Sequence, residues 1–330
     1  MMIRKLAFAG LSLAASSLLL VGCPAPEEDD DERTFAEIAP RAEQVRLSAP
    51  SGASPGAGTA SLYPSVDLAR DGDPALSTFY TFTRQTFDYV NLGTAWILGL
   101  VTTIVRYPVT QRTTSEATWG PWKGELSAAE WRLRVTRGED SLYSYVLEGR
   151  RVGQESYRAV VTGQGYPRGD ARRGLGSFVV DHDAADAIDP ARLRGADESG
   201  TTRVDHDLRS LREDLRGAYT IGVEGRPTAT AGRFDVALTR LDGGGGTVDI
   251  VSKGDIDADP AKRAFEDLTM RSRWVTSGAG RADVTVSRGD VPASVGTVVV
   301  TECWSPNFQQ SYYTDSAGLA PTTGEEALCP

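Results

Sequence analysis

The stretch from residue 108 to residue 304 is built of short segments in which apolar and polar side chains alternate, and this pattern restricts the fold more than any other feature. Residues 130–137 place tryptophan, leucine and valine between arginine and threonine, and residues 233–241 repeat the arrangement. A period of two is typical of strands with one buried and one wet face. Glycine-rich turns such as residues 243–246 separate the segments, which favours antiparallel pairing of consecutive strands. The pattern predicts strands at 113–119, 130–137, 142–149, 157–163, 176–182, 201–208, 218–224, 233–241, 247–252, 265–276, 282–287 and 297–304.

One long apolar segment precedes these strands, and we expect it to form a helix over residues 74–107. Its apolar side chains recur at steps of three, four and seven, which is the spacing of one helical face. Asp73 can cap the N-terminus, and Pro74 suits the first helical position. Pro108 cannot continue the helix. The helix is expected to lie buried in the core, with the sheet folded against it.

Two alternatives stay open for this segment. Gly93 and Gly99 each weaken a helix, so they mark either a kink or the close approach of another backbone. The threonine, valine, isoleucine and aromatic content also suits a hairpin of two strands at 80–90 and 95–107. The apolar part, 92–105, is shorter than the roughly 18–20 residues that cross a bilayer.

These patterns predict a mainly β protein in which a long antiparallel meander forms a curved sheet, or half-barrel, around one apolar helix. We expect one β-rich domain over residues 73–330, with a closed barrel or a two-layer sandwich as alternatives. The absence of alternating strands and helices argues against a doubly wound or α/β-barrel enzyme. Charged residues on the wet faces argue against an outer-membrane barrel. In architecture, the expected half-barrel resembles periplasmic lipoprotein carriers.

The N-terminus has the order of features found in an export signal. Two basic residues precede an apolar run over 6–21, which ends in Leu20-Val21-Gly22-Cys23. This end resembles the lipobox of bacterial lipoproteins, in which the cysteine is acylated and the signal is removed just before it. A general signal peptide with a chance cysteine, or an uncleaved anchor, is the alternative.

The lipobox resemblance implies a signal peptide over 1–22 and a lipid anchor on Cys23. Because Pro24 follows the cysteine, where proteins kept at the inner membrane typically carry aspartate, it also implies a place in the outer membrane of the cell envelope. Residues 23–72 are rich in acidic residues, proline, glycine and serine, so we expect a flexible, solvated tether with at most an edge strand at 45–47.

The net charge limits the kinds of partner that the protein can bind, and the cysteine content indicates its compartment. The formal net charge of −10 argues against nucleic acid, which requires a basic footprint. Once Cys23 carries lipid, two cysteines are left, and in an oxidising compartment Cys303 and Cys329 are expected to form a disulfide. That bond would fasten an irregular tail, 305–330, to the last strand. A reactive thiol is the alternative, although no histidine lies nearby in the sequence.

Two Asp-His-Asp triplets, at residues 181–183 and 205–207, contain both histidines of the chain. Side by side on neighbouring strands, they would offer four carboxylates or two imidazoles to a cation. The alternative places both triplets at the wet ends of strands, where they form Asp–His pairs without a metal.

An acidic stretch is similar to an EF-hand calcium loop, with Asp255, Asp257, Asp259 and Glu266 at loop positions 1, 3, 5 and 12. Pro260 stands where that family needs glycine for a sharp turn. The four acids are therefore weak metal candidates, a solvated turn is the alternative, and we expect no cofactor.

Tryptophans could serve as stacking platforms for sugars, and Trp119, Trp122 and Trp304 are the candidates, with a place in the core as the alternative. No serine-nucleophile elbow, zinc-protease motif or phosphate loop occurs. Residues 271–304 are similar to the C-terminal part of β-rich envelope lipoproteins of uncharacterised activity. We therefore expect a non-catalytic, lipid-anchored envelope protein that binds a hydrophobic ligand or an envelope protein. A structural or surface-interaction lipoprotein without a cavity is the first alternative, and a hydrolase is the second.

Overall fold

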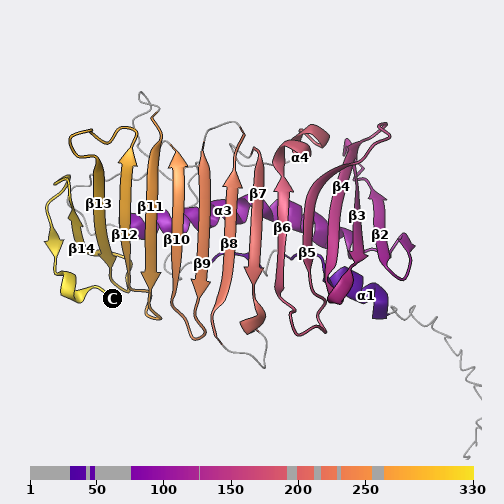
Figure 1. Cartoon of the computed structure of the whole chain (residues 1–330), viewed down its shortest axis with the longest axis horizontal. Helices are drawn as coiled ribbons and strands as arrows, with labels where there is room; N and C mark the ends of the chain where they lie inside the picture. The colour runs from indigo at the N-terminus through magenta and orange to yellow at the C-terminus, as the bar shows by residue number, and fades with distance from the viewer. Residues whose placement is uncertain are drawn as a thin grey trace, which may run out of the picture.

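The computed structural model describes residues 30–41, 45–48, 76–125, 127–191, 199–211, 217–228, 232–254 and 264–330. Within these residues, fifteen strands form one antiparallel sheet in which every strand pairs with its neighbours in sequence (Figure 1). The predicted meander is confirmed, and its twelve strands correspond to β2–β13. The strands are β1 (Gln111–Arg112), β2 (Glu116–Trp122), β3 (Ala129–Arg137), β4 (Tyr143–Arg151), β5 (Arg158–Gly165), β6 (Leu175–Asp181), β7 (Thr201–Asp207), β8 (Tyr219–Arg226), β9 (Arg233–Arg240), β10 (Gly246–Gly254), β11 (Glu266–Trp274), β12 (Gly280–Arg288), β13 (Thr297–Trp304), β14 (Gln310–Asp315) and β15 (Thr323–Gly324).

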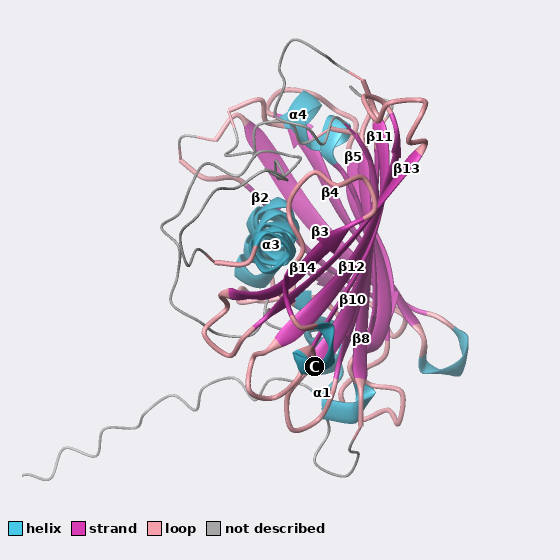
Figure 2. Ribbon diagram, turned by 90° about the vertical axis from the view of Figure 1, so that its left-hand side faces the viewer, coloured by secondary structure: helices cyan, strands magenta, loops and turns pink. Residues whose placement is uncertain are grey.

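The apolar helix, α3 (Thr78–Ile104), crosses one face of this sheet (Figures 1 and 2). We call this face the inner face and the opposite one the outer face. Along β3, every second residue is buried on the inner face, and the residues between them are partly exposed on the outer face. The alternation that predicted the strands is therefore explained by a sheet that is covered by the helix on one side only.

α3 is one unbroken helix, so neither the hairpin nor a break at the glycines occurs. The predicted cap at Asp73 is wrong, because the N-cap is Ser77, whose hydroxyl accepts a hydrogen bond from the Tyr80 N–H at 3.1 Å. The helix ends at Ile104 and not at residue 107. Pro108 prevents the helix from continuing past residue 107, but it does not account for an end three residues earlier.

Aromatic pairs attach the first half of α3 to strands of the sheet. Near its start, Tyr80 lies 6.0 Å from Trp304 of β13 between ring centroids, and Phe87 meets Trp274 of β11 edge-on. Beyond its end, the Trp119 indole of β2 donates to the Tyr107 carbonyl at 3.1 Å. A helix of 27 residues is about 40 Å long, whereas the strand row from β2 to β13 measures about 53 Å. The helix therefore spans most but not all of the width of the sheet, which twists along the row of strands (Figure 2).

The sheet is open, and its two edges are short. β1 and β15 have two residues each; β1 pairs with Ala117 and Thr118 of β2, and β15 pairs with Tyr312 and Tyr313 of β14. Short edge strands leave few unpaired backbone groups for another chain to join. The tail also differs from the prediction, since residues 305–330 were expected to be irregular but contain β14, which pairs with β13.

Part of the expected flexible tether packs against the body. Residues Asp30–Glu37 form helix α1, and Phe35 is fully buried with its ring 5.5 Å from that of Tyr143 on β4. Leu47 is buried as well, and the edge strand expected at 45–47 is wrong because Val45 is helical and no pairing follows it. The polar composition of the segment predicted a tether, because its few apolar residues are widely spaced among polar ones. These apolar residues are nevertheless buried in the core.

A side chain of α3 holds the second part of this segment. The Asn91 Oδ1 accepts from the Leu47 N–H, and its Nδ2 donates to the Leu47 carbonyl, each at 2.8 Å. We expect Asn91→Ala to lower the free energy of unfolding by about 1–2 kcal/mol, because two partly buried backbone groups lose their partner. Urea denaturation checks this value, with the exposed Gln85→Ala on the same helix as the control. Equal stability of the two variants would contradict the prediction.

Candidate functional site

A small pocket of about 40 Å³ lies between α3 and the sheet, lined by Gly93 and Thr94 of the helix and by His182, Val223 and Phe234 of the sheet side. A volume of this size holds water molecules. Sites for small organic ligands measure roughly 300–1,000 Å³. The inner pocket is therefore far smaller than a site for a hydrophobic ligand.

The two Asp-His-Asp triplets lie on neighbouring strands but at opposite ends of them. Asp181 at the end of β6 pairs in register with Thr201, whereas Asp207 at the end of β7 pairs with Leu175. Six residues of strand separate these positions, which is about 20 Å. The four carboxylates do not share a site, so the arrangement needed for a shared cation is not formed.

The first triplet has structural roles. The Asp181 carboxylate accepts from the Ala184 N–H at 2.7 Å and caps the short helix α4 (His182–Ile188). Asp183 accepts from the Gly200 N–H at 2.9 Å. His182 is buried, with its Nε2 2.9 Å from the Thr202 hydroxyl. The triplet thus holds the end of β6 against the start of β7, and its histidine is buried instead of lying at the wet end of a strand.

The second triplet is divided between the two faces of β7. Asp205 and Asp207 lie on the outer face, where each forms a two-bond ion pair with an arginine two residues away, Arg203 and Arg209 respectively. His206 lies on the inner face over Gly176. Burial lowers the pKa of His206 from 6.5 to about 4, although both neighbouring aspartates favour its charged form. His206 is therefore neutral at pH 7.

The metal candidates are only partly described. Asp255, Asp257 and Asp259 lie outside the described residues. Glu266, at the start of β11, is buried and its Oε1 accepts from the Asp290 N–H at 2.9 Å, which fixes the turn after β12. Among the residues that the structure describes, no group of three or more histidine, cysteine, aspartate or glutamate side chains is placed to hold a metal ion.

The tryptophans belong to the interior more than to the surface. Trp119 and Trp304 are almost fully buried, so neither can be a platform for a ligand in this structure. Trp122 is partly buried and packs against Tyr107, with ring centroids 4.1 Å apart and the ring planes tilted by 31°. The core interpretation of Trp119 and Trp304 is confirmed.

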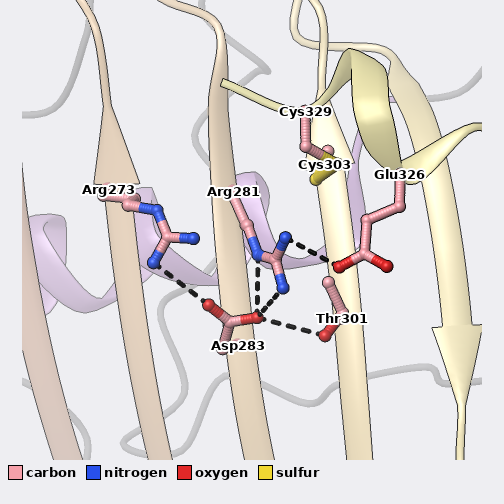
Figure 3. The surroundings of a disulfide bond; sticks show 7 residues. All are labelled: Arg273, Arg281, Asp283, Thr301, Cys303, Glu326 and Cys329. Carbon is pink, nitrogen blue, oxygen red and sulfur yellow. Dashed lines mark hydrogen bonds and ion pairs between the residues drawn. A yellow bond between two sulfur atoms is a disulfide. The ribbon is translucent and has the colours of Figure 1, made fainter.

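The disulfide joins Cys303 of β13 to Cys329 in the tail, with the two Cα atoms 5.6 Å apart. This part of the prediction is confirmed. An ion-pair network flanks it on the outer face, where Arg281 binds both Asp283 and Glu326 (Figure 3). The disulfide and the Arg281–Glu326 pair together hold the tail on the sheet.

A buried carboxyl group lies beside the disulfide, on the inner face. Glu302 is completely buried, and its Oε1 accepts from the Ser77 hydroxyl and, at 3.3 Å, from the Phe79 N–H at the start of α3. Its other oxygen, Oε2, has no hydrogen-bond partner among the described residues. Burial raises the pKa of Glu302 from 4.5 to about 7, against the opposing effect of these hydrogen bonds.

A second depression lies on the outer face, across the middle of the sheet. We call it the outer groove; its volume is about 540 Å³. A row of side chains in register across β5–β9 runs along it. The row consists of Gln164, Ser177, Asp205, Gly222 and Ala237.

Small side chains make the outer groove deep, and paired charges line its side. Gly222 and Ala237 leave the sheet backbone uncovered between longer neighbours. The Arg203–Asp205 pair, with N–O distances of 2.6 and 2.7 Å, stands at its side. Sequence reasoning missed this groove because its residues come from five strands, and no local motif links them.

Neither protein-family models, nor curated proteins, nor solved structures match this chain. None of the described helices combines the length and the apolar character needed to cross a membrane. The functional assignment therefore rests on the residues and their arrangement.

Proposed function

We propose that the chain is a non-catalytic protein of the bacterial cell envelope, anchored by lipid on Cys23 to the outer membrane, and that it uses the outer face of its sheet as a binding surface. The anchor rests on the resemblance of residues 20–23 to a lipobox. The disulfide between Cys303 and Cys329 supports a compartment outside the reducing cytosol.

The observation that carries the binding role is the contrast between the two depressions. The inner pocket measures about 40 Å³ and the outer groove about 540 Å³. Only the groove reaches the size range of ligand sites. Between the two uses expected from the sequence, this contrast favours a surface-interaction protein with a packed core over a carrier of a hydrophobic ligand.

The side chains of the groove support binding without catalysis. Asp205 is engaged by Arg203, and Asp207 by Arg209, so neither carboxylate is placed as a free acid or base. His206 also borders the groove, but its ring packs over Gly176, on the side of β7 away from these two carboxylates. A hydrolytic centre would need these groups to converge on one substrate atom.

We expect Cys23→Ser to move the protein from the membrane to the soluble fraction, because a cysteine thiolate is the group that receives the lipid. Fractionation of a Gram-negative host and incorporation of labelled palmitate measure this change. Ser17→Ala, in the apolar run of the signal, is the control and should stay membrane-bound. Membrane retention of the Cys23→Ser variant with undiminished palmitate label would contradict the proposed anchor.

A further inference from the structure

We propose that the outer groove binds a neutral oligosaccharide. This inference rests on the proposed use of the outer face for binding and names the chemical class of its ligand. It is carried by four features of the groove: its balanced charge, its mixture of donors and acceptors, its small-residue floor, and the position of its strands inside the sheet.

The charges of the groove cancel in pairs. Arg203, which lines the groove, binds Asp205, and Arg209, which lies outside the lining, binds Asp207, each through two hydrogen bonds of 2.6–2.9 Å. A charged ligand such as a phosphate or a nucleic acid would meet no net charge of opposite sign there. A carboxylate offers about four lone-pair sites, so an arginine that occupies two leaves others for ligand hydroxyl groups.

The remaining polar side chains can donate and accept. Gln164, Thr220 and Thr239 line the groove beside the ion pairs. An amide and two hydroxyl groups match the hydroxyl groups of a sugar, which also act as donor and acceptor at once. A lipid chain would leave these polar groups without partners and is therefore a poor fit.

The floor and one wall are apolar enough for the C–H face of a sugar ring. Gly222 and Ala237 form the floor. Tyr166 stands at the wall, and the Arg172 guanidinium lies 4.2 Å from its ring centroid and holds the ring in place. Aromatic rings combine a large apolar surface with a polar edge, which suits a ligand that has both.

The position of the groove argues against an extended peptide. Strands β5–β9 are paired on both sides, so their backbone N–H and C=O groups are already bonded to neighbouring strands. A peptide that adds to a sheet gains its affinity from free backbone groups at an edge. Recognition in the outer groove has to come from side chains, as it does for a sugar.

Gly222→Val provides the sharpest test. A Cβ at residue 222 would meet only the Asp205 carbonyl, at 3.9 Å, so a side chain fits without strain and fills the groove floor. Valine also favours strands. The variant should therefore fold as the parent does while it loses the ligand. Thr285→Val on the outer face of β12 is the matched control, since Thr285 is exposed and does not line the groove.

Isothermal titration of the full chain carrying Cys23→Ser would use maltohexaose, cellohexaose and chitohexaose as probes. Hexagalacturonate serves as a charged sugar of the same length, and a glycine–serine hexapeptide as the peptide. We expect saturable binding of at least one neutral hexasaccharide. Gly222→Val and Asp205→Ala should each weaken it about tenfold or more, and Thr285→Val should leave it unchanged.

Three results would overturn the inference: no binding of any neutral hexasaccharide at millimolar concentration, preference for the hexagalacturonate or the peptide, or undiminished sugar binding by Gly222→Val. Circular dichroism melting of each variant excludes misfolding as the cause. Because the titrated protein has no anchor, its result is independent of membrane attachment. Failure of sugar binding therefore leaves the Cys23 anchor standing, and failure of the anchor leaves the sugar site standing.

Discussion

Replacing Cys303 and Cys329 together by alanine is expected to lower the free energy of unfolding by about 3–4 kcal/mol. The two residues are 26 positions apart in the sequence, and a crosslink that closes such a loop restricts the unfolded chain to that extent in the chain-entropy model. The folded tail keeps other contacts, among them β14 on β13 and the Arg281–Glu326 ion pair. The fold should therefore survive with reduced stability.

Denaturant titration of the oxidised protein and the double variant measures this loss, and reduction of the parent protein should reproduce it. Glu326→Ala is the control, because it removes only an ion pair whose carboxylate side chain is 59% exposed. Exposed pairs contribute about 0–1 kcal/mol. A double variant as stable as the oxidised parent would show that the tail is held without the disulfide.

The second large effect is expected from Glu302→Gln, which should change how the free energy of unfolding depends on pH. The pKa of Glu302 is about 7 in the folded protein and 4.5 ordinarily, so the folded state holds a proton between these values that the unfolded chain has released. The contribution of this group to the free energy of unfolding is fully present below pH 4.5 and falls as the pH rises towards 7. Above pH 7 the protein has lost roughly 3 kcal/mol of it. Glutamine stays neutral, so Glu302→Gln should equal the parent near pH 4.5 and exceed its stability by roughly that amount at pH 8.

The comparison must be between variant and parent at each pH, because His206 acts in the opposite direction. Its pKa is about 4 in the folded protein and 6.5 ordinarily, so its contribution to stability rises from pH 4 to pH 6.5. His206 is present in both proteins, so its contribution cancels when the stability of the parent is subtracted from that of Glu302→Gln. Urea titrations from pH 4.5 to 8 give that difference, with the exposed Glu325→Gln as control. A difference that does not change with pH would contradict the burial of an ionisable Glu302.

The strand that carries Glu302 was predicted correctly, whereas the cap of the helix that Glu302 contacts was not. The strand at 297–304 was predicted from its alternation, and β13 has those bounds. The alternation places Glu302 on the same face as Val300 and Trp304, but it does not indicate that the carboxylate binds the start of α3. The cap of that helix was assigned to Asp73 for the same reason, since a local signal favoured it and the partner of Ser77 lies 225 residues further along the chain.

The packed part of the N-terminal segment illustrates a second limit. Residues 23–72 have the composition of a tether, and their few apolar residues are too widely spaced for a periodic pattern. Phe35 and Leu47 are nevertheless buried, because Tyr143 at the start of β4 and the side chain of Asn91 on α3 provide contacts for them. Composition averages over a segment, whereas burial is decided residue by residue.

The sequence by itself determined the meander, the single long helix and the disulfide, because each depends on a period, a run or a count that neighbouring residues carry. Only the tertiary structure decided which residues of different strands lie close together on each face of the sheet. It separated the two Asp-His-Asp triplets to opposite ends of β6 and β7, and it brought Gln164, Asp205 and Gly222 into one groove. The physical reason is register: residues of different strands become neighbours through hydrogen bonds between strands, and no single strand encodes which residues of the next one lie beside it.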